Sequence, residues 1–138
     1  MTAFIKREYD YALRICAYLA GRRDSPVVPI SHLSKMLYIT RPFTTKIVYQ
    51  LKNKHILGTV QGKEGGVYLI RPAEEITIFE VLDAMGFNSR LNECLDEDYD
   101  CPVENRCRLH LFFEELEKQM MDRLKSKTLS NVALLINN

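Results

Sequence analysis

The sequence lacks the features that mark several common classes of protein. No stretch approaches the roughly 18 consecutive apolar residues of a membrane-spanning helix, and the N-terminus MTAFIKREYD is charged where a secretion signal would be apolar. Its few glycines match neither the G-x-G-x-x-G fingerprint nor a phosphate-binding P-loop, which argues against the familiar nucleotide-binding folds. We also recognise no catalytic constellation. We therefore expect a cytoplasmic protein that is not an enzyme and has no membrane or small-molecule partner.

What the sequence does contain is an ordinary soluble composition with an uneven distribution of charge. Its 138 residues, 46% hydrophobic and 27% charged, are enough for one domain with a proper core. The net charge of +1 conceals two opposite halves. Residues 1–72 hold 12 Lys and Arg against 4 Asp and Glu, a net +8, whereas residues 73–138 hold 7 against 14, a net −7. A basic half of this kind is typical of a surface that binds a polyanion.

Apolar spacing predicts helices at the start of the chain. Residues 5–22 carry apolar side chains at three- and four-residue intervals, and Gly21 ends that pattern. After a break that contains two prolines, Ser31 is expected to cap a short second helix through Leu37. These two helices would form the first part of the basic half.

A third helix is predicted directly after a tight turn at residues 38–40. Thr40 is its expected N-cap, Pro42 falls in the first helical turn, and the pattern continues to about Lys54. Two short helices joined by such a turn, with basic and polar residues on the second, are typical of a helix-turn-helix that enters the major groove of DNA.

The next segment predicts a β-hairpin. The β-rich runs 56–60 and 67–70 flank the glycine-rich sequence Gln-Gly-Lys-Glu-Gly-Gly at residues 61–66. A hairpin in this position would be the wing of a winged helix, and its tip would present Gln61 and Lys63 to DNA.

Beyond the wing, the chain alternates between ordered and irregular patterns. Thr77 is expected to cap a short helix over residues 78–85 that packs under the winged helix. Residues 88–105 show little periodicity, which predicts an unusually long loop. Loops of this length are usually functional, and a bound metal centre would explain this one.

A long helix is predicted from about residue 106, for about five turns. It would pack against a second copy of the chain, across its own first helix, or both. Thr128 would then cap a last short helix that runs through Val132 to Ile136. The apolar stripe of the long helix consists of Leu109, Phe112, Phe113, Leu116, Met120 and Leu124.

Three of the four cysteines lie close together. Cys94, Cys101 and Cys107 fall within 14 residues, separated by six and then five residues. In a cytosolic chain such a cluster indicates metal or redox chemistry rather than a disulfide framework. Thiolates are soft ligands that suit both iron-sulfur and zinc centres. Cys16 stands alone in a helical pattern and is expected to be a small core residue.

Taken in chain order, these segments resemble the Rrf2 family of bacterial winged-helix transcription regulators, whose iron-sulfur members include IscR and NsrR. The resemblance covers nearly the whole chain: Tyr11-Ala12-Leu13-Arg14, the helix-turn-helix at residues 30–51, the wing at 62–69, the helix at 78–85, and the cysteine triplet before the long helix. Its most specific parts are the wing and the triplet.

The resemblance implies a fold and a set of partners. The fold is mainly α with a small β-hairpin wing: a winged helix-turn-helix domain over residues 1–87, a cluster-binding loop over 88–107, and a dimerisation helix with a docking helix over 108–138. The protein would be a homodimer that binds double-stranded DNA at a pseudo-palindromic operator. Its residues expected to contact DNA are Arg41, Thr44, Thr45, Lys46, Tyr49, Gln50 and Lys52 on the third helix, with Gln61 and Lys63 on the wing.

The resemblance also implies a metal site, with a [2Fe-2S] or [4Fe-4S] cluster held by the cysteine triplet and a fourth ligand. His110, one helical turn after Cys107, would complete an IscR-like set. Asp10 aligns instead with an aspartate that NsrR-like members use from the partner subunit. A thiol-based or zinc-containing regulator without a cluster, and a small iron-sulfur carrier, remain as alternatives.

Two departures from the family lie in the wing. Gln61 stands where the family often has an arginine, and Val67 follows the double glycine where an aromatic residue is usual.

Overall fold

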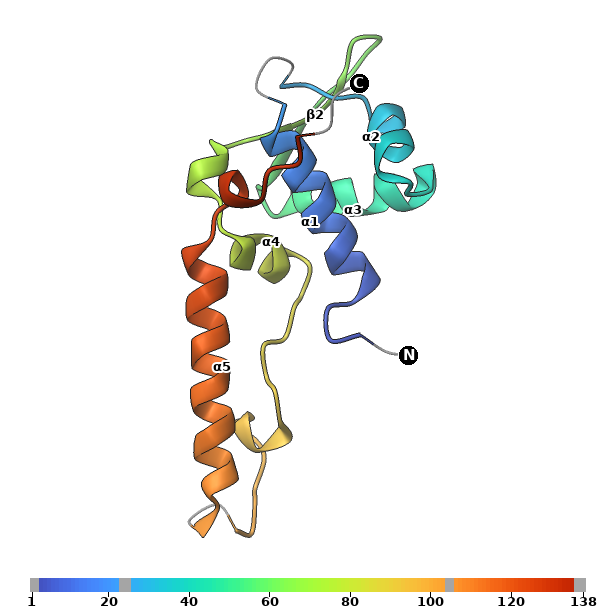
Figure 1. Ribbon diagram of the computed structural model, residues 1–138. Helices are drawn as coiled ribbons and strands as arrows, with labels where there is room; N and C mark the ends of the chain where they lie inside the picture. The colour runs from blue at the N-terminus through green and yellow to red at the C-terminus, as the bar shows by residue number, and fades with distance from the viewer. Residues whose placement is uncertain (1–2, 23–25, 104–105, 136–138) are drawn as a thin grey trace.

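The computed structural model describes residues 3–22, 26–103 and 106–135 (Figure 1). Within these ranges the chain forms five α-helices and one antiparallel hairpin, with short 3-10 helices between them. The mainly α winged-helix fold with a β-hairpin wing is therefore confirmed. In chain order the elements are α1 (Arg7–Ala20), α2 (Ile30–Leu37), α3 (Arg41–Asn53), β1 (Leu57–Val60), β2 (Gly66–Leu69), η1 (Ala73–Glu75), α4 (Ile78–Ala84), η2 (Glu93–Leu95), α5 (Arg108–Ser126) and η4 (Leu129–Val132).

Helix α1 lies at the centre of the winged-helix body, which we define as α1 to α4, the hairpin and η4. Its residues Ala12, Ile15 and Tyr18 are fully buried, at the spacing that places them on one side of a helix. They share a core with buried residues of α2, α3 and the hairpin. The body therefore owes its order to one continuous apolar cluster.

The helix-turn-helix forms as predicted, with two corrections at its caps. Helix α2 begins one residue before Ser31, so Pro29 occupies the N-cap position and Ser31 is an exposed residue of the first turn. Thr40 is the N-cap residue of α3, but its side chain makes no capping hydrogen bond. The turn is closed instead by Ser34, whose hydroxyl donates to the Ile39 carbonyl at 2.5 Å.

The wing is extended by a third segment. Leu57 pairs with Leu69 and Val60 with Gly66, and Val28 adds a bridge to Val67 through hydrogen bonds of 2.8 and 2.9 Å. This close approach requires a glycine, because a Cβ on Gly66 would lie 2.4 Å from the Val28 carbonyl oxygen.

Helix α4 and the C-terminal segment complete the body. Thr77 caps α4 as predicted, because its hydroxyl accepts a hydrogen bond from the Glu80 amide at 3.1 Å. Leu129 is fully buried, which docks η4 on the body. Thr128 is the N-cap residue as predicted, but the last helix is shorter than predicted: the chain forms only the 3-10 turn of η4, and residues 133–135 that follow are not helical. Residue 136 of that prediction lies outside the described residues.

The remaining part, which we call the extension, consists of residues 88–103 and 106–126. The loop leads away from the body, and helix α5 begins at the far end and runs back beside the loop to the body (Figure 1). The structure buries no residue of α5, and it buries none of the described loop residues either. Across the described ranges, no helix has the length and apolar character needed to cross a membrane.

Candidate DNA-binding face and cysteine loop

One face of α3 is polar and open to solvent. Helix α3 turns its apolar residues Ile47, Val48 and Leu51 into the core, which leaves the opposite face outward. The residues on that outward face include two positive charges near the N-terminal half of the helix and an aromatic ring that is 62% exposed at Tyr49. The exposed residues from the predicted set are Arg41, Thr45, Lys46, Tyr49 and Lys52.

Two other residues of the predicted set do not share that exposure. Thr44 is fully buried, and its hydroxyl donates to the Thr40 carbonyl at 2.9 Å. Its prediction as a DNA contact was wrong, because Thr44 shares the inward face with Ile47 and Leu51 and satisfies its polar group within the helix. Gln50 is half-buried, and its Oε1 atom is buried with no hydrogen-bond partner among the described residues.

A row of charged and aromatic side chains joins the start of α1 to the outward face of α3. Asp10 pairs with Arg14 at 2.6 Å, and the Arg14 guanidinium lies 5.3 Å from the centre of the Tyr11 ring. Tyr11 meets Phe43 edge to face at 5.5 Å between ring centres. The Lys46 Nζ atom lies 5.7 Å from the centre of the Phe43 ring. We call this row the Asp10–Lys46 row, and its ring and charge contacts join α1 to α3.

The tip of the wing is polar and exposed. Gln61 and Lys63 both point to solvent, on either side of Gly62. Gly62 adopts φ +105, a conformation that favours glycine, and its carbonyl accepts a hydrogen bond from Gly65 at 3.1 Å. The tip is thus a tight turn that presents the Gln61 amide, the Lys63 ammonium and the Glu64 carboxylate at the edge of the body.

The cysteine triplet is spread along the extension. Cys94 lies in η2, Cys101 in the loop, and Cys107 is the N-cap residue of α5; all three are half-buried. Among the residues that the structure describes, no three His, Cys, Asp or Glu side chains are arranged to hold a metal ion. The structure therefore brings the three thiols onto one extension without gathering them into one ligand set.

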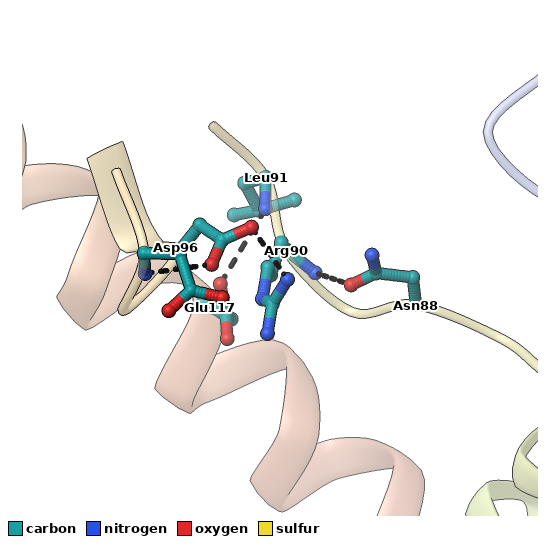
Figure 2. A network of polar contacts seen from close by, with 6 residues as sticks. Asn88, Arg90, Leu91, Asp96 and Glu117 are labelled. Atoms are coloured by element: carbon teal, nitrogen blue, oxygen red, sulfur yellow. Dashed lines mark hydrogen bonds and ion pairs between the residues drawn. The ribbon is translucent and has the colours of Figure 1, made fainter. Parts of the chain in front are cut away.

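A polar network holds the loop against α5 (Figure 2). The Arg90 guanidinium pairs with Asp96 at 2.8 Å, and the Asp96 carboxylate also accepts a hydrogen bond from the Asp98 amide at 3.0 Å. The Leu91 amide donates to Glu117 of α5 at 3.4 Å, which ties the loop to the helix. Our sequence reasoning missed Arg90 and Glu117; the only available signal was one isolated arginine ahead of an acidic run.

The two candidate fourth ligands lie in different environments. His110 lies on α5, with a side chain only 18% exposed; its Nε2 atom is 3.3 Å from Glu114, and its Nδ1 atom is buried with no partner among the described residues. Asp10 is 46% exposed at the edge of an open hollow of about 630 Å³ that Tyr11 and Arg14 also line. His110 thus shares an element with Cys107, whereas Asp10 belongs to α1.

Cys16 is a core residue, as predicted. It is fully buried in α1, and burial raises the pKa of its thiol to about 12. A thiol kept neutral in this way is a poor ligand and a poor nucleophile. Cys16 is therefore separate in both place and chemistry from the triplet.

Comparisons with known proteins agree with this architecture. A family model described as Rrf2, "Iron-dependent Transcriptional regulator", matches residues 5–134. A putative HTH-type transcriptional regulator of Aquifex aeolicus is 32% identical over 124 residues, covering 88% of this chain and 85% of the relative. The HTH-type transcriptional regulator NsrR of Oceanobacillus iheyensis is 27% identical over 129 residues, covering 87% and 88%.

A solved structure shows the same fold. The structure of CymR, the global cysteine regulator of B. subtilis, matches with a TM-score of 0.78 at 19% identity, covering 96% of this chain and 98% of that one. At this low identity, the structural similarity establishes the fold alone. The family is established by the family model, which matches nearly the whole chain. The chain belongs to the Rrf2 family, and it is a winged-helix transcriptional regulator.

Proposed function

We propose that this regulator is a homodimer that binds a pseudo-palindromic operator and senses redox state, iron-sulfur status or nitric oxide through an iron-sulfur cluster. Cys94, Cys101 and Cys107 would hold the cluster, with His110 or Asp10 as the fourth ligand. The cluster would supply a reactive centre whose loss or oxidation changes the protein. The observation that carries this proposal is the buried Nδ1 atom of His110, three residues after Cys107, which has no hydrogen-bond partner among the described residues.

The donor atoms on the extension suit such a group. Three thiols and one imidazole are the soft and borderline donors of iron-sulfur and zinc centres. A buried imidazole nitrogen without a partner is unfavourable, and a ligand at Nδ1 would satisfy it. Cys107 stands at the N-terminus of α5, where the helix dipole favours negative charge such as that of a thiolate. The first turn of α5 contains no acidic residue that would already provide this charge.

Asp10 as ligand would connect the cluster to the DNA-binding face. Its carboxylate now pairs with Arg14, the first contact of the Asp10–Lys46 row. A carboxylate that ligates the cluster of the partner subunit would share its negative charge with the metal, so its pairing with Arg14 would weaken and the row would change. His110→Ala and Asp10→Ala, each compared with wild type for visible spectrum and iron content, distinguish the two ligands: only loss of the true ligand changes the cluster bands.

DNA binding would use the outward face of α3 and the tip of the wing. In a helix-turn-helix, residues near the N-terminus of the recognition helix reach the base edges, and neighbouring residues contact phosphates. The residues that we propose for these contacts are Arg41, Thr45, Lys46, Tyr49, Gln50, Lys52, Gln61 and Lys63.

The extension supports the proposed homodimer. Leu109 and Phe112 of α5 are 64% and 57% exposed, and Leu116 is 40% exposed. An apolar stripe of this size that its own body leaves uncovered is typical of an interaction surface. A second copy of α5 would cover the stripe and place two recognition helices on one operator.

A thiol-based or zinc-containing regulator is the second candidate. Two observations favour its thiol-based form: no three metal-binding side chains are gathered among the described residues, and the fold is like that of CymR, a cysteine regulator. In this case the loop thiols would act directly, by oxidation or by binding zinc.

Metal analysis of anaerobically purified full-length protein separates the two candidates. We expect visible absorption bands with matched iron and sulfide contents. Cys101→Ala should remove the colour while leaving the dimer intact by gel filtration, and Cys16→Ala, the matched control, should keep both. Colourless and iron-free protein after attempted cluster reconstitution would refute the cluster, and its zinc content would then decide between the zinc and thiol forms.

A further inference from the structure

Tyr38, in the turn between α2 and α3, combines two unfavourable features. Its backbone adopts the left-handed conformation, with φ 56 and ψ 42, and its side chain is 92% exposed. The left-handed region is unfavourable for any residue with a Cβ atom, and glycine would adopt it without this strain. A ring so exposed also packs on almost nothing. Neither the fold of the turn nor the core therefore explains why a tyrosine stands here.

The turn itself is firmly anchored, so the position of Tyr38 is well determined. Its neighbour Ile39 is only 3% exposed. The Ile39 amide donates to the Ser34 carbonyl at 3.1 Å, and the Ser34 hydroxyl donates to the Ile39 carbonyl. With the residue on one side buried and bonded back to α2, the Tyr38 side chain is held outward, three residues before α3 begins.

The charge around the turn indicates the chemistry of a partner. Residues 26–63, which span α2, α3 and the first half of the wing, contain six Lys and Arg and no Asp or Glu. Lys35 in the last turn of α2 and Arg41 at the start of α3 are both exposed on either side of Tyr38. A tyrosine hydroxyl within so positive a surface would meet anionic oxygens.

We propose that Tyr38 is a positioning residue for DNA, whose hydroxyl donates a hydrogen bond to a backbone phosphate beside the groove that α3 enters. In helix-turn-helix docking, the first helix crosses the DNA backbone and the second enters the groove, so the turn between them lies at the phosphates. Tyrosine is among the side chains that make such contacts, which fix the register of the protein on the duplex. This inference rests on the proposed use of α3 as the recognition helix.

Two substitutions test the proposal, using the full-length protein and a 30-base-pair duplex that the wild type has selected from a random library. Tyr38→Gly relieves the left-handed strain and removes the ring, so we expect a higher melting temperature together with affinity weaker by about tenfold. Tyr38→Phe keeps both ring and strain, so we expect an unchanged melting temperature and a several-fold loss of affinity. Because the hydroxyl is neutral, the slope of log affinity against log salt should not change in either variant.

His55→Gly is the matched control, because His55 is the other non-glycine residue with positive φ in the described chain, at φ 61. It lies beyond the opposite end of α3 and borders a hollow that Phe79 and Asp83 of α4 also line. We expect this variant to gain melting temperature with no change in affinity.

Other results would overturn the proposal. Wild-type affinity in Tyr38→Gly would remove Tyr38 from the interface, and wild-type affinity in Tyr38→Phe would exclude the hydroxyl contact. A lower melting temperature in Tyr38→Gly would indicate a structural role for the ring. If the wild type itself binds no duplex in a salt-dependent way, the proposed function fails first, and the inference fails with it.

Discussion

The winged-helix body and the extension follow different physical rules, although both are largely helical. The body surrounds a continuous core in which residues such as Ile15, Leu33 and Leu51 are fully buried. The described residues of the extension include none that is buried, and the loop is joined to α5 by a polar contact between the Leu91 amide and Glu117. The body therefore contains the apolar burial that folding requires, and the extension does not.

This difference shows where each part obtains its stability. The body is stabilised by contacts between residues of one chain, so the positions of its residues follow from the sequence of that chain. The extension leaves apolar side chains such as Leu109 exposed, and it leaves the buried Nδ1 atom of His110 without a hydrogen-bond partner among the described residues. Its stability would come from a second copy of the chain and from a bound group. Three predictions test this contrast, in order of decreasing effect.

The largest effect is expected on dimerisation, from a charge placed in the apolar stripe of α5. Leu109 and Leu111 are both 64% exposed. However, residues two positions apart on an α-helix point about 200° away from each other around its axis. Leu109 belongs to the stripe with Phe112 and Leu116, whereas Leu111 faces away from it. Leu109→Asp should weaken the dimer by about 2 kcal/mol or more, roughly 30-fold, as loss of a central interface contact does.

Leu111→Asp is the matched control for that change, since it buries no part of the proposed interface. Analytical ultracentrifugation over a range of concentrations measures both dimer constants, and circular dichroism shows whether each body remains folded. Equal weakening by the two substitutions would mean that the stripe is not the contact surface. No weakening by either would place the dimer contact elsewhere.

A smaller effect is expected from Cys16, which contrasts a thiol of the body with those of the extension. Burial raises its pKa from 9.0 to about 12, so the unfolded chain loses this proton at lower pH than the folded chain does. Its contribution to stability is present below pH 9 and is lost as pH rises from 9 towards 12, by about 1.4 kcal/mol for each pH unit.

Urea unfolding of wild type and Cys16→Ala at pH 8 and pH 10 measures this loss. The difference in unfolding free energy between the two proteins should shrink by about 1.4 kcal/mol at the higher pH. Alkylation of the native protein at pH 8 should also modify Cys101 and Cys107 before Cys16. Early modification of Cys16 would show that the body opens around α1.

The contrast also explains which features could be predicted from the sequence. Periodic apolar spacing and turn residues predicted α1, α3, the wing and the Thr77 cap, because local preference and burial agree there. The predicted cap at Ser31 was wrong because the helix begins earlier, at Ile30, and Pro29 is its N-cap residue. The length of the C-terminal helix was predicted wrongly because the burial of Leu129 against the body depends on tertiary contacts, which apolar spacing does not reveal.

The candidate site was less accessible to sequence reasoning. Cysteine spacing identified the triplet but could not show how the loop is held, since the contact between Leu91 and Glu117 joins residues 26 positions apart. The positive φ of Tyr38 could not be predicted from the sequence either, because tyrosine rarely adopts this conformation and its presence in a turn does not indicate it. Thr44 was misassigned because its polar type suggested exposure, while its position in the helix placed it inward.

The smallest expected effect separates the outward and inward faces of α3. Lys46→Ala removes an exposed positive charge and should weaken binding to the selected duplex about fivefold, as loss of one phosphate contact does, and reduce the salt slope by about one. Thr44→Val, two residues away, keeps the shape of a buried side chain and loses only the bond to the Thr40 carbonyl. It should leave affinity and salt slope unchanged and lower the unfolding free energy by about 1 kcal/mol, because the Thr40 carbonyl still accepts from the Thr44 amide. Fluorescence anisotropy at several salt concentrations, with urea unfolding of both variants, compares the two faces directly. Affinity lost in Thr44→Val without loss of stability would mean that α3 turns a different face to DNA.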